Sequence, residues 1–309
     1  MVSIVIWCVL FAVYAGYGNR CLNWKAAAFC WEGKILDLRA DIEAVYADSA
    51  VERNTKIDEL LAAFRLALNQ GTVRAAEFDG SNWKVNTWIK KGLALCVRFG
   101  RLCQIGIGLP IDLDTLHRRQ LTVQDQVRVT DSTCFVRDGA FISPGCTLMP
   151  HTVIQMGAFI GTDTIIDVGV GIGVCAQIGS RVHINAGAQI HGHIQPLEML
   201  PVIIGDNVSI GANCVIGGGV IVSSGAAILP GTSLSCQTRL YDPIKKQRHC
   251  ATDTQPLVVP AGAIVVSGVR ATTKEESRDL LLGVQVGVIA GYVGERDRPA
   301  MVLDRLLDN

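Results

Sequence analysis

The chain has 309 residues with 28 basic and 28 acidic side chains, so its formal net charge is zero. A balanced charge excludes a general electrostatic attraction to nucleic acid or to an anionic membrane, and any anionic ligand must be bound by a local group of arginine and lysine residues. The 32 glycines and the aromatic content of 6% favour a coiled β architecture over a helical one.

Residues 1–36 are expected to form an extension outside the fold. The first 19 carry no charged side chain and include an apolar stretch from Val2 to Tyr14. A secretory signal begins with a basic region, and a membrane-spanning helix needs about 20 apolar residues. The segment meets neither requirement in full, so we interpret it as an N-terminal extension, for which an upstream start of translation is one origin. A membrane anchor is the alternative interpretation.

Residues 37–128 are predicted to form an α-rich N-terminal domain. Apolar residues between Ile57 and Leu68 recur at helical spacing. Thr55 and Asp58 are placed to cap the start of this helix, and Gly71 is placed to end it.

Residues 73–91 carry the signals of a hairpin followed by a second helix. The dipeptide Asp79-Gly80 is a common turn sequence between two strands. Asn86 is a residue type that often precedes the first turn of a helix, so we expect the helix to open near it.

An aliphatic residue falls on every sixth position over much of the second half of the chain. A period of six fits neither a 3.6-residue helix nor the two-residue alternation of a plain strand, so it indicates a repeating turn and excludes a helix. The series is Val136, Ile142, Leu148, Ile154, Ile160, Ile166, Ile172, Ile178, Ile184 and Ile190, then, after a short insertion, Ile204, Ile210, Ile216, Val222, Ile228, Leu234 and Leu240.

A small or β-branched residue follows each aliphatic residue after four positions, and Gly, Asn or Asp often comes directly after it. Two inward residues per six would stack on their counterparts in the next coil, while Gly and Asn ease the backbone conformations at corners. The sequence therefore predicts a β-solenoid of hexapeptide repeats. The small positions are Ala140, Cys146, Thr152, Ala158, Thr164, Val170, Ala176, Val182, Ala188, Val208, Cys214, Val220, Ala226, Thr232 and Thr238.

The eleven cysteines do not form a metal-binding or disulfide pattern. The chain has no C-x-x-C pair, and Cys134, Cys146 and Cys214 occupy the small position of the repeat, with Cys175 one place before it. We interpret them as small core residues, which indicates a reducing, cytoplasmic compartment.

Several segments, taken in order from about residue 38 to the C-terminus, resemble the tetrahydrodipicolinate N-succinyltransferase family of lysine and diaminopimelate biosynthesis. They are Trp83-x4-Trp88-Ile89-Lys90-Lys91, Gly139-Ala140-Phe141-Ile142, Leu148-Met149-Pro150, Ile166-Asp167, Cys175-Ala176-Gln177-Ile178-Gly179, Val182-His183 and Val259-Pro260-Ala261-Gly262-x4-Ser267-Gly268.

The resemblance implies a mainly β fold, a left-handed parallel β-helix of hexapeptide repeats with an α-rich N-terminal domain. It also implies three hexapeptides per coil, with the acyltransferase domain at 129–270 and a C-terminal segment at 271–309. The expected partners are two further copies in a homotrimer with pockets between subunits, a small anionic amino-acid substrate and a CoA thioester. Acyl-CoA, as succinyl-CoA or acetyl-CoA, would be a co-substrate and not a permanently bound cofactor, and no nucleic acid or membrane partner is expected.

Two residues match positions that carry the chemistry in this family. Asp167, directly after Ile166, matches the active-site aspartate, and its alternative role is that of an ordinary corner residue. Arg128 matches the arginine that binds a substrate carboxylate, a task that suits the guanidinium because it offers two parallel hydrogen bonds. A solvated surface arginine is the alternative.

Two departures from the family pattern put the acceptor and the acyl group in doubt. Gln195 stands where the family has a glutamate, and an amide cannot accept a proton as a carboxylate does. Glu198, three residues later, is a candidate to replace it. Asn213 lies in a second altered segment, Gly211-Ala212-Asn213-Cys214-Val215, where the family has Gly-Ala-Arg-Ser-Glu, so we expect it near the substrate.

Histidine chemistry is a competing interpretation, because other hexapeptide acyltransferases use a histidine as the base. His191 and His193 lie just before the insertion at 195–203, and His183 lies one repeat earlier. His191 is a candidate base, although a surface or structural role is the default. No further ligand accompanies the His-x-His pair at a suitable spacing, so no metal is expected.

The expected CoA-binding residues are basic or small. Arg270, Lys274 and Arg278 follow the last predicted coil, where family members place the pantetheine arm and the phosphates. Four small residues, Gly187, Ala188, Gly211 and Ala212, would admit the thin pantetheine arm, or are small because the coil is tight.

Two other functions remain open at this stage. One is a paralogue recruited to secondary metabolism, such as the tabtoxin-pathway enzyme that resembles this family, using acetyl-CoA or another acyl-CoA. The other is a non-catalytic trimeric scaffold that keeps the solenoid without the chemistry.

Overall fold

A computed structural model describes residues 37–100, 103–104, 113–114, 117–252, 255–271 and 283–293. The expectations for residues 1–36, Lys274 and Arg278 lie outside these residues. From Asp41 onward the described residues belong to one compact unit, and all contacts below lie within it. Within the described residues, no helix is long and apolar enough to cross a membrane.

The α-rich region holds a helix over residues 37–47, α3 (Thr55–Asn69) and α4 (Thr87–Phe99). The predicted cap of α3 is wrong by one residue, because Asn54 is the N-cap and its side-chain oxygen accepts the Ile57 N–H at 3.1 Å. Asp58 instead pairs with Arg53 at 2.7 Å. Gly71 ends the helix as predicted, with a φ of +67° directly after the C-cap residue.

A short hairpin separates the two helices. It pairs β1 (Ala76–Phe78) with β2 (Trp83–Val85) in antiparallel register. The turn spans Asp79 to Asn82, with the Asp79 carboxylate accepting the N–H groups of Ser81 and Asn82, so the loop is longer than the two residues expected. Asn86 precedes α4 as predicted.

Between α4 and the coils lie a small antiparallel pair, β3 (Cys103–Gln104) with β4 (Leu113–Asp114), and a 3-10 helix, η1 (Val123–Asp125).

Helices α3 and α4 pack against each other through Phe64 and Trp88, whose ring centroids are 6.0 Å apart. A Cβ at Gly92 would lie 2.6 Å from the Phe64 ring, so only glycine allows this approach.

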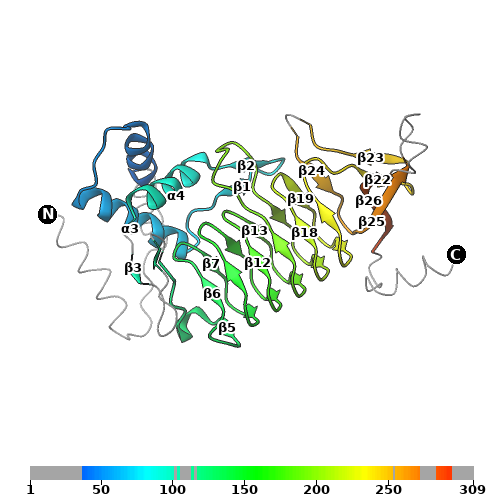
Figure 1. Cartoon of the computed structure of the whole chain (residues 1–309), viewed down its shortest axis with the longest axis horizontal. Helices are drawn as coiled ribbons and strands as arrows, with labels where there is room; N and C mark the ends of the chain where they lie inside the picture. The colour runs from blue at the N-terminus through cyan, green and yellow to red at the C-terminus, as the bar shows by residue number, and fades with distance from the viewer. Residues whose placement is uncertain are drawn as a thin grey trace, which may run out of the picture. The chain divides into compact units, whose positions relative to one another are not determined.

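The remaining strands form three sheets around a common core, in which the coil strands pair in parallel, while β25–β26 and β22–β23 pair antiparallel (Figure 1). The first face, in sheet order, contains β5 (Arg128–Val129), β8 (Thr147–Leu148), β11 (Ile165–Ile166), β14 (His183–Ile184), β17 (Ser209–Ile210), β20 (Ala227–Ile228), β25 (Ala263–Ala271), β26 (Gly283–Tyr292), β22 (Leu240–Asp242) and β23 (Gln247–His249). The second face contains β6 (Phe135–Val136), β9 (Val153–Ile154), β12 (Gly171–Ile172), β15 (Gln189–Ile190), β18 (Val215–Ile216) and β21 (Ser233–Leu234). The third face contains β7 (Phe141–Ile142), β10 (Phe159–Ile160), β13 (Gln177–Ile178), β16 (Ile203–Ile204), β19 (Val220–Val222) and β24 (Leu257–Val259).

The register gives three hexapeptides per coil. Thr147 pairs with Ile165, which pairs with His183, a step of 18 residues each time. Gln177 pairs with Ile203, a longer step that accommodates an insertion between β15 and β16. The predicted fold class, a parallel β-helix with an α-rich N-terminal region, is confirmed, while the exact domain boundaries stay a prediction.

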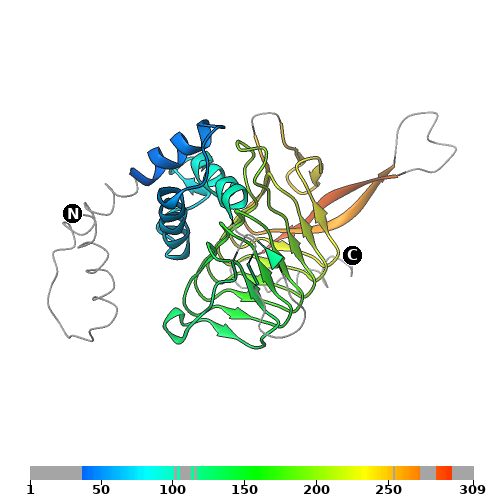
Figure 2. The same cartoon turned by 60° about the vertical axis from the view of Figure 1, so that its left-hand side comes forward.

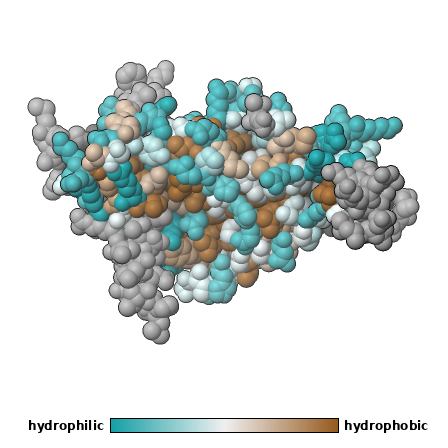
Figure 3. Space-filling view, turned by 45° about the horizontal axis from the view of Figure 1, so that its top comes forward, coloured by the Kyte–Doolittle hydropathy of each residue, from teal (hydrophilic) through white to brown (hydrophobic). Residues whose placement is uncertain are grey.

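The aliphatic series forms the core, as predicted. Ile166, Ile172 and Ile178 are at most 1% exposed and belong to one continuous cluster inside the coils. Leu240 is buried too, but it lies in β22, which pairs with β26 and not with a coil strand. The coils are therefore interrupted after β21 and resume with β24 and β25, which pair with β19 and β20. On the face seen in Figure 3, hydrophobic and hydrophilic residues are interspersed.

The four cysteines in or beside the small position of the repeat are core residues, as predicted, whereas Cys236 and Cys250 are exposed. Among the described side chains, Cys134, Cys146, Cys175 and Cys214 are buried free thiols.

The last coil continues into β25 and β26, a long antiparallel ribbon that extends past the coils (Figure 2).

Candidate functional site

Asp167 lies at the edge where the chain passes from the first face to the second. It directly follows β11, and its side chain is half-buried. Its Oδ1 accepts the Val168 N–H at 2.7 Å, which is the corner role that any aspartate plays in such a turn. Among the described residues, no hydrogen bond is recorded to its Oδ2, so one carboxylate oxygen remains available for a ligand.

Arg128 lies two strands from Asp167 on the same face. The register runs from Arg128 to Thr147 and on to Ile165, which places Arg128 about 10 Å along the sheet from β11. The side chain is exposed on the outer side of β5. Arg128 and Asp167, which lie two coils apart on this face, can therefore both contact one anionic molecule.

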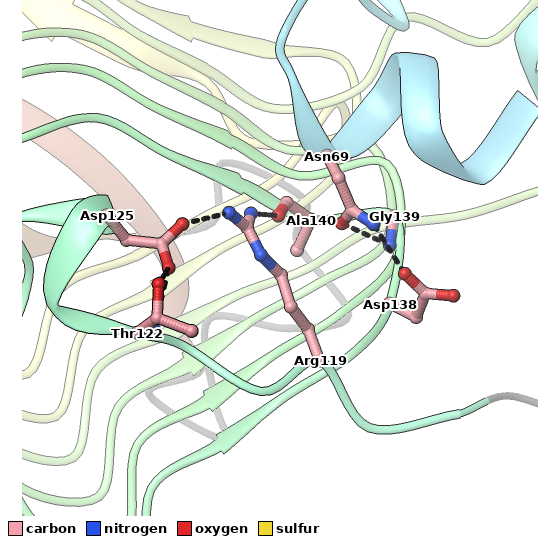
Figure 4. A network of polar contacts seen from close by, with 7 residues as sticks. All are labelled: Asn69, Arg119, Thr122, Asp125, Asp138, Gly139 and Ala140. Atoms are coloured by element: carbon pink, nitrogen blue, oxygen red, sulfur yellow. Dashed lines mark hydrogen bonds and ion pairs between the residues drawn. The ribbon is translucent and has the colours of Figure 1, made fainter. Parts of the chain in front are cut away.

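A polar network fixes the segment that leads to Arg128 (Figure 4). Thr122 and Asp125 form a capping box around η1, in which Asp125 Oδ2 accepts the Thr122 N–H at 2.7 Å. Arg119 donates to Asp125 Oδ1 at 2.6 Å and to the Ala140 carbonyl. Only two residues separate the end of η1 from the first strand of the coils, so this network sets where β5 begins.

A second contact in the same view joins α3 to the first coil. Asn69 donates to Asp138, and the Gly139 N–H donates to Asn69 Oδ1 at 2.8 Å (Figure 4). Arg65 adds an ion pair to Asp138 at 2.9 Å. The helical region is thereby anchored on the coils next to the Arg128 segment.

Gln195 and Glu198 do not join Asp167 within one chain. Asp167 precedes β12, whereas the insertion that carries Gln195 and Glu198 follows β15. Because β12 and β15 are parallel neighbours, their starts lie at one edge of the second face and their ends at the other. The residues that we expected to form one catalytic group therefore lie at opposite edges, and both insertion residues are exposed.

Lys90 holds the insertion in place, a role that sequence reasoning missed. The side chain is fully buried, and its Nζ donates to the carbonyls of Pro196 at 3.0 Å and Met199 at 2.6 Å. Burial lowers the pKa of Lys90, against opposing effects of Cys175 and Glu198. The only signal in the sequence was its place in the Trp88-Ile89-Lys90-Lys91 motif.

A cavity of about 550 Å³ occupies the second face between these two edges. Its polar lining includes His151, Gln189, His191 and His193. Burial, and then the neighbouring His191 and Lys90, lower the pKa of His193 and so favour the neutral form of its imidazole. Among the described residues, no group of three or more His, Cys, Asp or Glu side chains could hold a metal ion.

Packing accounts for the small size of three of the four residues expected to admit pantetheine, namely Gly187, Ala188 and Gly211. A Cβ at Gly211 would clash with the Pro230 nitrogen of the next coil, and one at Gly187 would clash with the Asn213 side chain. Ala188 points into the core and is fully buried, so its side chain cannot line a ligand surface, which corrects that expectation. Ala212 is half-buried.

Asn213 and Arg270 lie further along the coils. Asn213 is exposed at the same edge as Asp167, two coils on, with a φ of +55°. Arg270, at the exposed end of β25, donates to the Tyr241 hydroxyl. It lies beside Lys246 and Arg248, which sequence reasoning also missed although the run Lys245-Lys246-Gln247-Arg248 marks a concentration of charge.

The family model and the sequence relatives agree on one family. Residues 37–99 match the model for the tetrahydrodipicolinate N-succinyltransferase N-terminal region. A 2,3,4,5-tetrahydropyridine-2,6-dicarboxylate N-succinyltransferase from Methylorubrum extorquens is 34% identical over 244 residues, covering 75% of this chain and 84% of its own length. An enzyme of the same name from Sodalis glossinidius is 30% identical over 87% of this chain and 97% of its own. Among solved structures, the acetyltransferase domain of PglB from Neisseria gonorrhoeae matches with a TM-score of 0.34 and 20% identity, over 45% of this chain and 53% of its own.

Proposed function

Since the chain belongs to the 2,3,4,5-tetrahydropyridine-2,6-dicarboxylate N-succinyltransferase family, we propose that it transfers a succinyl group from succinyl-CoA to the amine of a tetrahydrodipicolinate-type amino dicarboxylate. The observation that carries this proposal is the 34% identity over 244 residues, a span that covers three quarters of the chain. The product would serve lysine and diaminopimelate biosynthesis.

In the proposed reaction water first adds across the ring C=N bond of the tetrahydropyridine, which turns the imine nitrogen into an amine. The amine nitrogen then attacks the thioester carbonyl, the new C–N bond forms, and the C–S bond breaks. The amine loses a proton and the departing CoA sulfur gains one, so the reaction needs a group that accepts a proton and groups that align the reactants. Asp167 is the proposed acceptor, because one of its carboxylate oxygens is available. Arg128 is the proposed partner of a substrate carboxylate.

The complete site would form between subunits of a homotrimer. Asp167 lies at one edge of the second face and the Gln195–Glu198 insertion at the other. The two would therefore form one site if the Asp167 edge of one subunit faces the insertion edge of a neighbouring subunit. Closed rotational symmetry is common among oligomers and would make all three sites equivalent. Asn213 and the cavity on the second face would border the acceptor. We place the enzyme in the cytoplasm, consistent with the buried free thiols.

The altered residues Gln195 and Asn213 support one alternative. A loss of the family carboxylate and cation at these positions would suit another acyl donor or acceptor, as in the tabtoxin-type paralogue with acetyl-CoA.

Glu198 lies in the same insertion as Gln195 and lines a different cavity, of about 800 Å³, next to Trp83 on the third face. This position makes it a weak replacement for the missing glutamate.

The test is thiol release by the full chain, offered succinyl-CoA or acetyl-CoA with tetrahydrodipicolinate. Turnover with succinyl-CoA would support the proposed activity and show that Gln195 is tolerated. Turnover with acetyl-CoA alone would support the recruited paralogue. No turnover with either donor would contradict the proposed activity and favour the scaffold or another acceptor.

A further inference from the structure

A pocket of about 510 Å³ lies where the chain passes from the third face to the first, beside the β1–β2 hairpin (Figure 1). We call it the edge pocket, and its lining includes Arg74, Trp83, Ser143, Phe159 and Asp206. Asp206 comes just before β17, whereas Asp167 comes just after β11, and these two strands belong to the same parallel sheet. Within one chain the edge pocket and the candidate site therefore lie at opposite edges of the first face.

Phe159 and Gln177 hold the Arg74 guanidinium in this pocket. The guanidinium carbon lies 3.6 Å from the centre of the Phe159 ring, and Nε donates to Gln177 Oε1 at 2.9 Å. Gln177 is fixed in turn, because it is buried and its amide nitrogen donates to the Cys175 carbonyl at 2.9 Å. Among the described residues, no hydrogen bond or ion pair is recorded for the two terminal nitrogens of Arg74. A guanidinium with a fixed position and two free donor groups suits a carboxylate.

Asp206 brings a negative charge to the same pocket without pairing with Arg74. Its Oδ1 accepts the Ser180 N–H at 2.8 Å, and no hydrogen bond from another described residue is recorded to its Oδ2. Burial lowers the pKa of Arg74 while the charges of Glu77 and Asp206 oppose this change, so both carboxylates lie within electrostatic reach of the guanidinium. Across the part of the chain that the structure describes, no ion pair joins Arg74 to either carboxylate. A cation and an anion therefore border one opening without contacting each other.

Ser143 adds a hydroxyl that has no protein partner. The residue is only 5% exposed and it lines the edge pocket. Within the described ranges, no hydrogen bond is recorded for its side chain. Buried hydroxyl groups normally have a hydrogen-bond partner, so a polar ligand in the pocket would supply the one that the chain does not.

We propose that the edge pocket binds a free α-amino acid. At neutral pH an α-amino acid carries a carboxylate and an ammonium group on one carbon atom, so it can fill the gap between Arg74 and Asp206 and neutralise both charges. Its carboxylate would accept hydrogen bonds from the Arg74 guanidinium and the Ser143 hydroxyl, and its ammonium group would donate to Asp206 Oδ2. A ligand that carries only one of the two charges would leave the other side of the pocket unpaired.

The surroundings of Trp83 favour a hydrophobic side chain on this amino acid. Trp83 also lines the cavity of about 800 Å³ on the third face, together with Phe78, Leu200, Ile221 and Val258. Phe78 is 56% exposed and Val258 is 38% exposed. An aromatic or long aliphatic side chain that extends past Trp83 would cover this apolar surface.

The test measures binding to the full chain without CoA or acceptor, so it does not depend on turnover. Calorimetry would compare phenylalanine with 3-phenylpropanoate, which lacks the ammonium group, and with phenylalaninamide, which lacks the carboxylate. Asp206→Asn keeps an oxygen for the Ser180 N–H but loses the charge, and Arg74→Lys keeps the charge but loses the guanidinium fork. Asp131→Asn is the matched control, because Asp131 is another exposed aspartate whose Oδ1 accepts a backbone N–H, that of Thr133 at 2.7 Å, and it does not line the pocket.

We expect the wild-type chain to bind phenylalanine roughly tenfold more tightly than either analogue. Asp206→Asn should bind phenylalanine about as weakly as 3-phenylpropanoate, whose own affinity should not change. Arg74→Lys should weaken the binding of phenylalanine and 3-phenylpropanoate alike and leave phenylalaninamide unaffected. Asp131→Asn should match the wild type with all three ligands.

Three results would overturn the proposal. The first is no binding of phenylalanine, leucine or methionine at millimolar concentration, and the second is equal affinity of the wild-type chain for phenylalanine and both analogues. The third is displacement of phenylalanine by tetrahydrodipicolinate, which would make the pocket part of the acceptor site. Succinyl transfer is assayed separately, so its absence beside phenylalanine binding would contradict only the proposed function.

Discussion

At the scale of single residues, Asp167 combines a corner role with a chemical one, and the two can be separated. Asparagine keeps the oxygen that accepts the Val168 N–H but cannot accept a proton. We expect Asp167→Asn to lower kcat for succinyl transfer by about 10²- to 10⁴-fold while thermal unfolding stays unchanged. The measurement is thiol release together with a melting curve.

Asp163→Asn is the matched control for that variant. Asp163 occupies a corner at the other end of the same strand, with a φ of +58°, a conformation that asparagine tolerates. Its replacement should leave turnover near the wild-type rate. An intact rate in Asp167→Asn would remove Asp167 from the mechanism, and an equal loss in both variants would indicate a structural effect.

Asp125 gives a pH-dependent prediction at the same scale. Desolvation alone would raise its pKa, but hydrogen bonds from Thr122 and Arg119 outweigh it and hold the pKa below its ordinary value. A carboxyl group whose pKa is lower in the folded than in the unfolded state stabilises the folded state at pH values above its unfolded-state pKa of about 3.9. This stabilisation is lost as the pH falls through the folded-state pKa.

Asp125→Asn should therefore lower the free energy of unfolding by about 1–3 kcal/mol at pH 7, and the difference from wild type should shrink below about pH 4. Urea unfolding of both proteins at pH 7 and at about pH 3 checks this expectation. If wild type and variant differ in free energy of unfolding by the same amount at both pH values, the charge of Asp125 does not contribute to stability.

At the scale of elements, the sequence predicts repeated structure well and single contacts poorly. The six-residue period predicts the coils because each aliphatic side chain must stack on its counterpart, so every repeat reports the same constraint. The N-cap of α3 was predicted as Thr55 and is Asn54, since both types cap helices and only the backbone decides between them. The contact of Lys90 with Pro196 and Met199 joins residues more than a hundred positions apart, and no local pattern encodes it.

Lys90 and its neighbour Lys91 offer a matched pair of variants on α4. Lys90 is fully buried on two carbonyls, whereas Lys91 is 26% exposed and pairs with Glu43 at the long distance of 3.9 Å. Lys90→Met leaves two carbonyls without their donor, so we expect a loss of about 1–3 kcal/mol of stability and faster amide exchange in residues 195–199. Lys91→Met should cost less than about 1 kcal/mol and leave that exchange unchanged.

Hydrogen exchange and denaturant unfolding, each measured on both the Lys90→Met and the Lys91→Met variant, test these expectations. If the insertion supplies part of the site, Lys90→Met should also lower kcat, because the insertion loses its fixed position. Equal exchange in residues 195–199 for both variants would contradict the positioning role of Lys90.

At the scale of the whole molecule, the separation of Asp167 from the Gln195–Glu198 insertion is the strongest argument for an oligomeric site. The hexapeptide period could predict which residues face outward, but not that Asp167 and the Gln195–Glu198 insertion, which we propose for the site, would lie at opposite edges of the second face. This follows only from the order of the sheets, in which Asp167 precedes β12 and the insertion follows β15.

Subunit mixing tests this arrangement. Co-expression of Asp167→Asn chains with Lys90→Met chains would produce trimers in which some interfaces pair an intact Asp167 with an intact insertion. Random assembly makes roughly one interface in four intact on both sides, so turnover should recover to about a quarter of wild type while each variant alone remains low. Because each chain carries one lesion, a site built within a single chain would gain nothing from mixing, and turnover no higher than the average of the two variants would contradict the shared site.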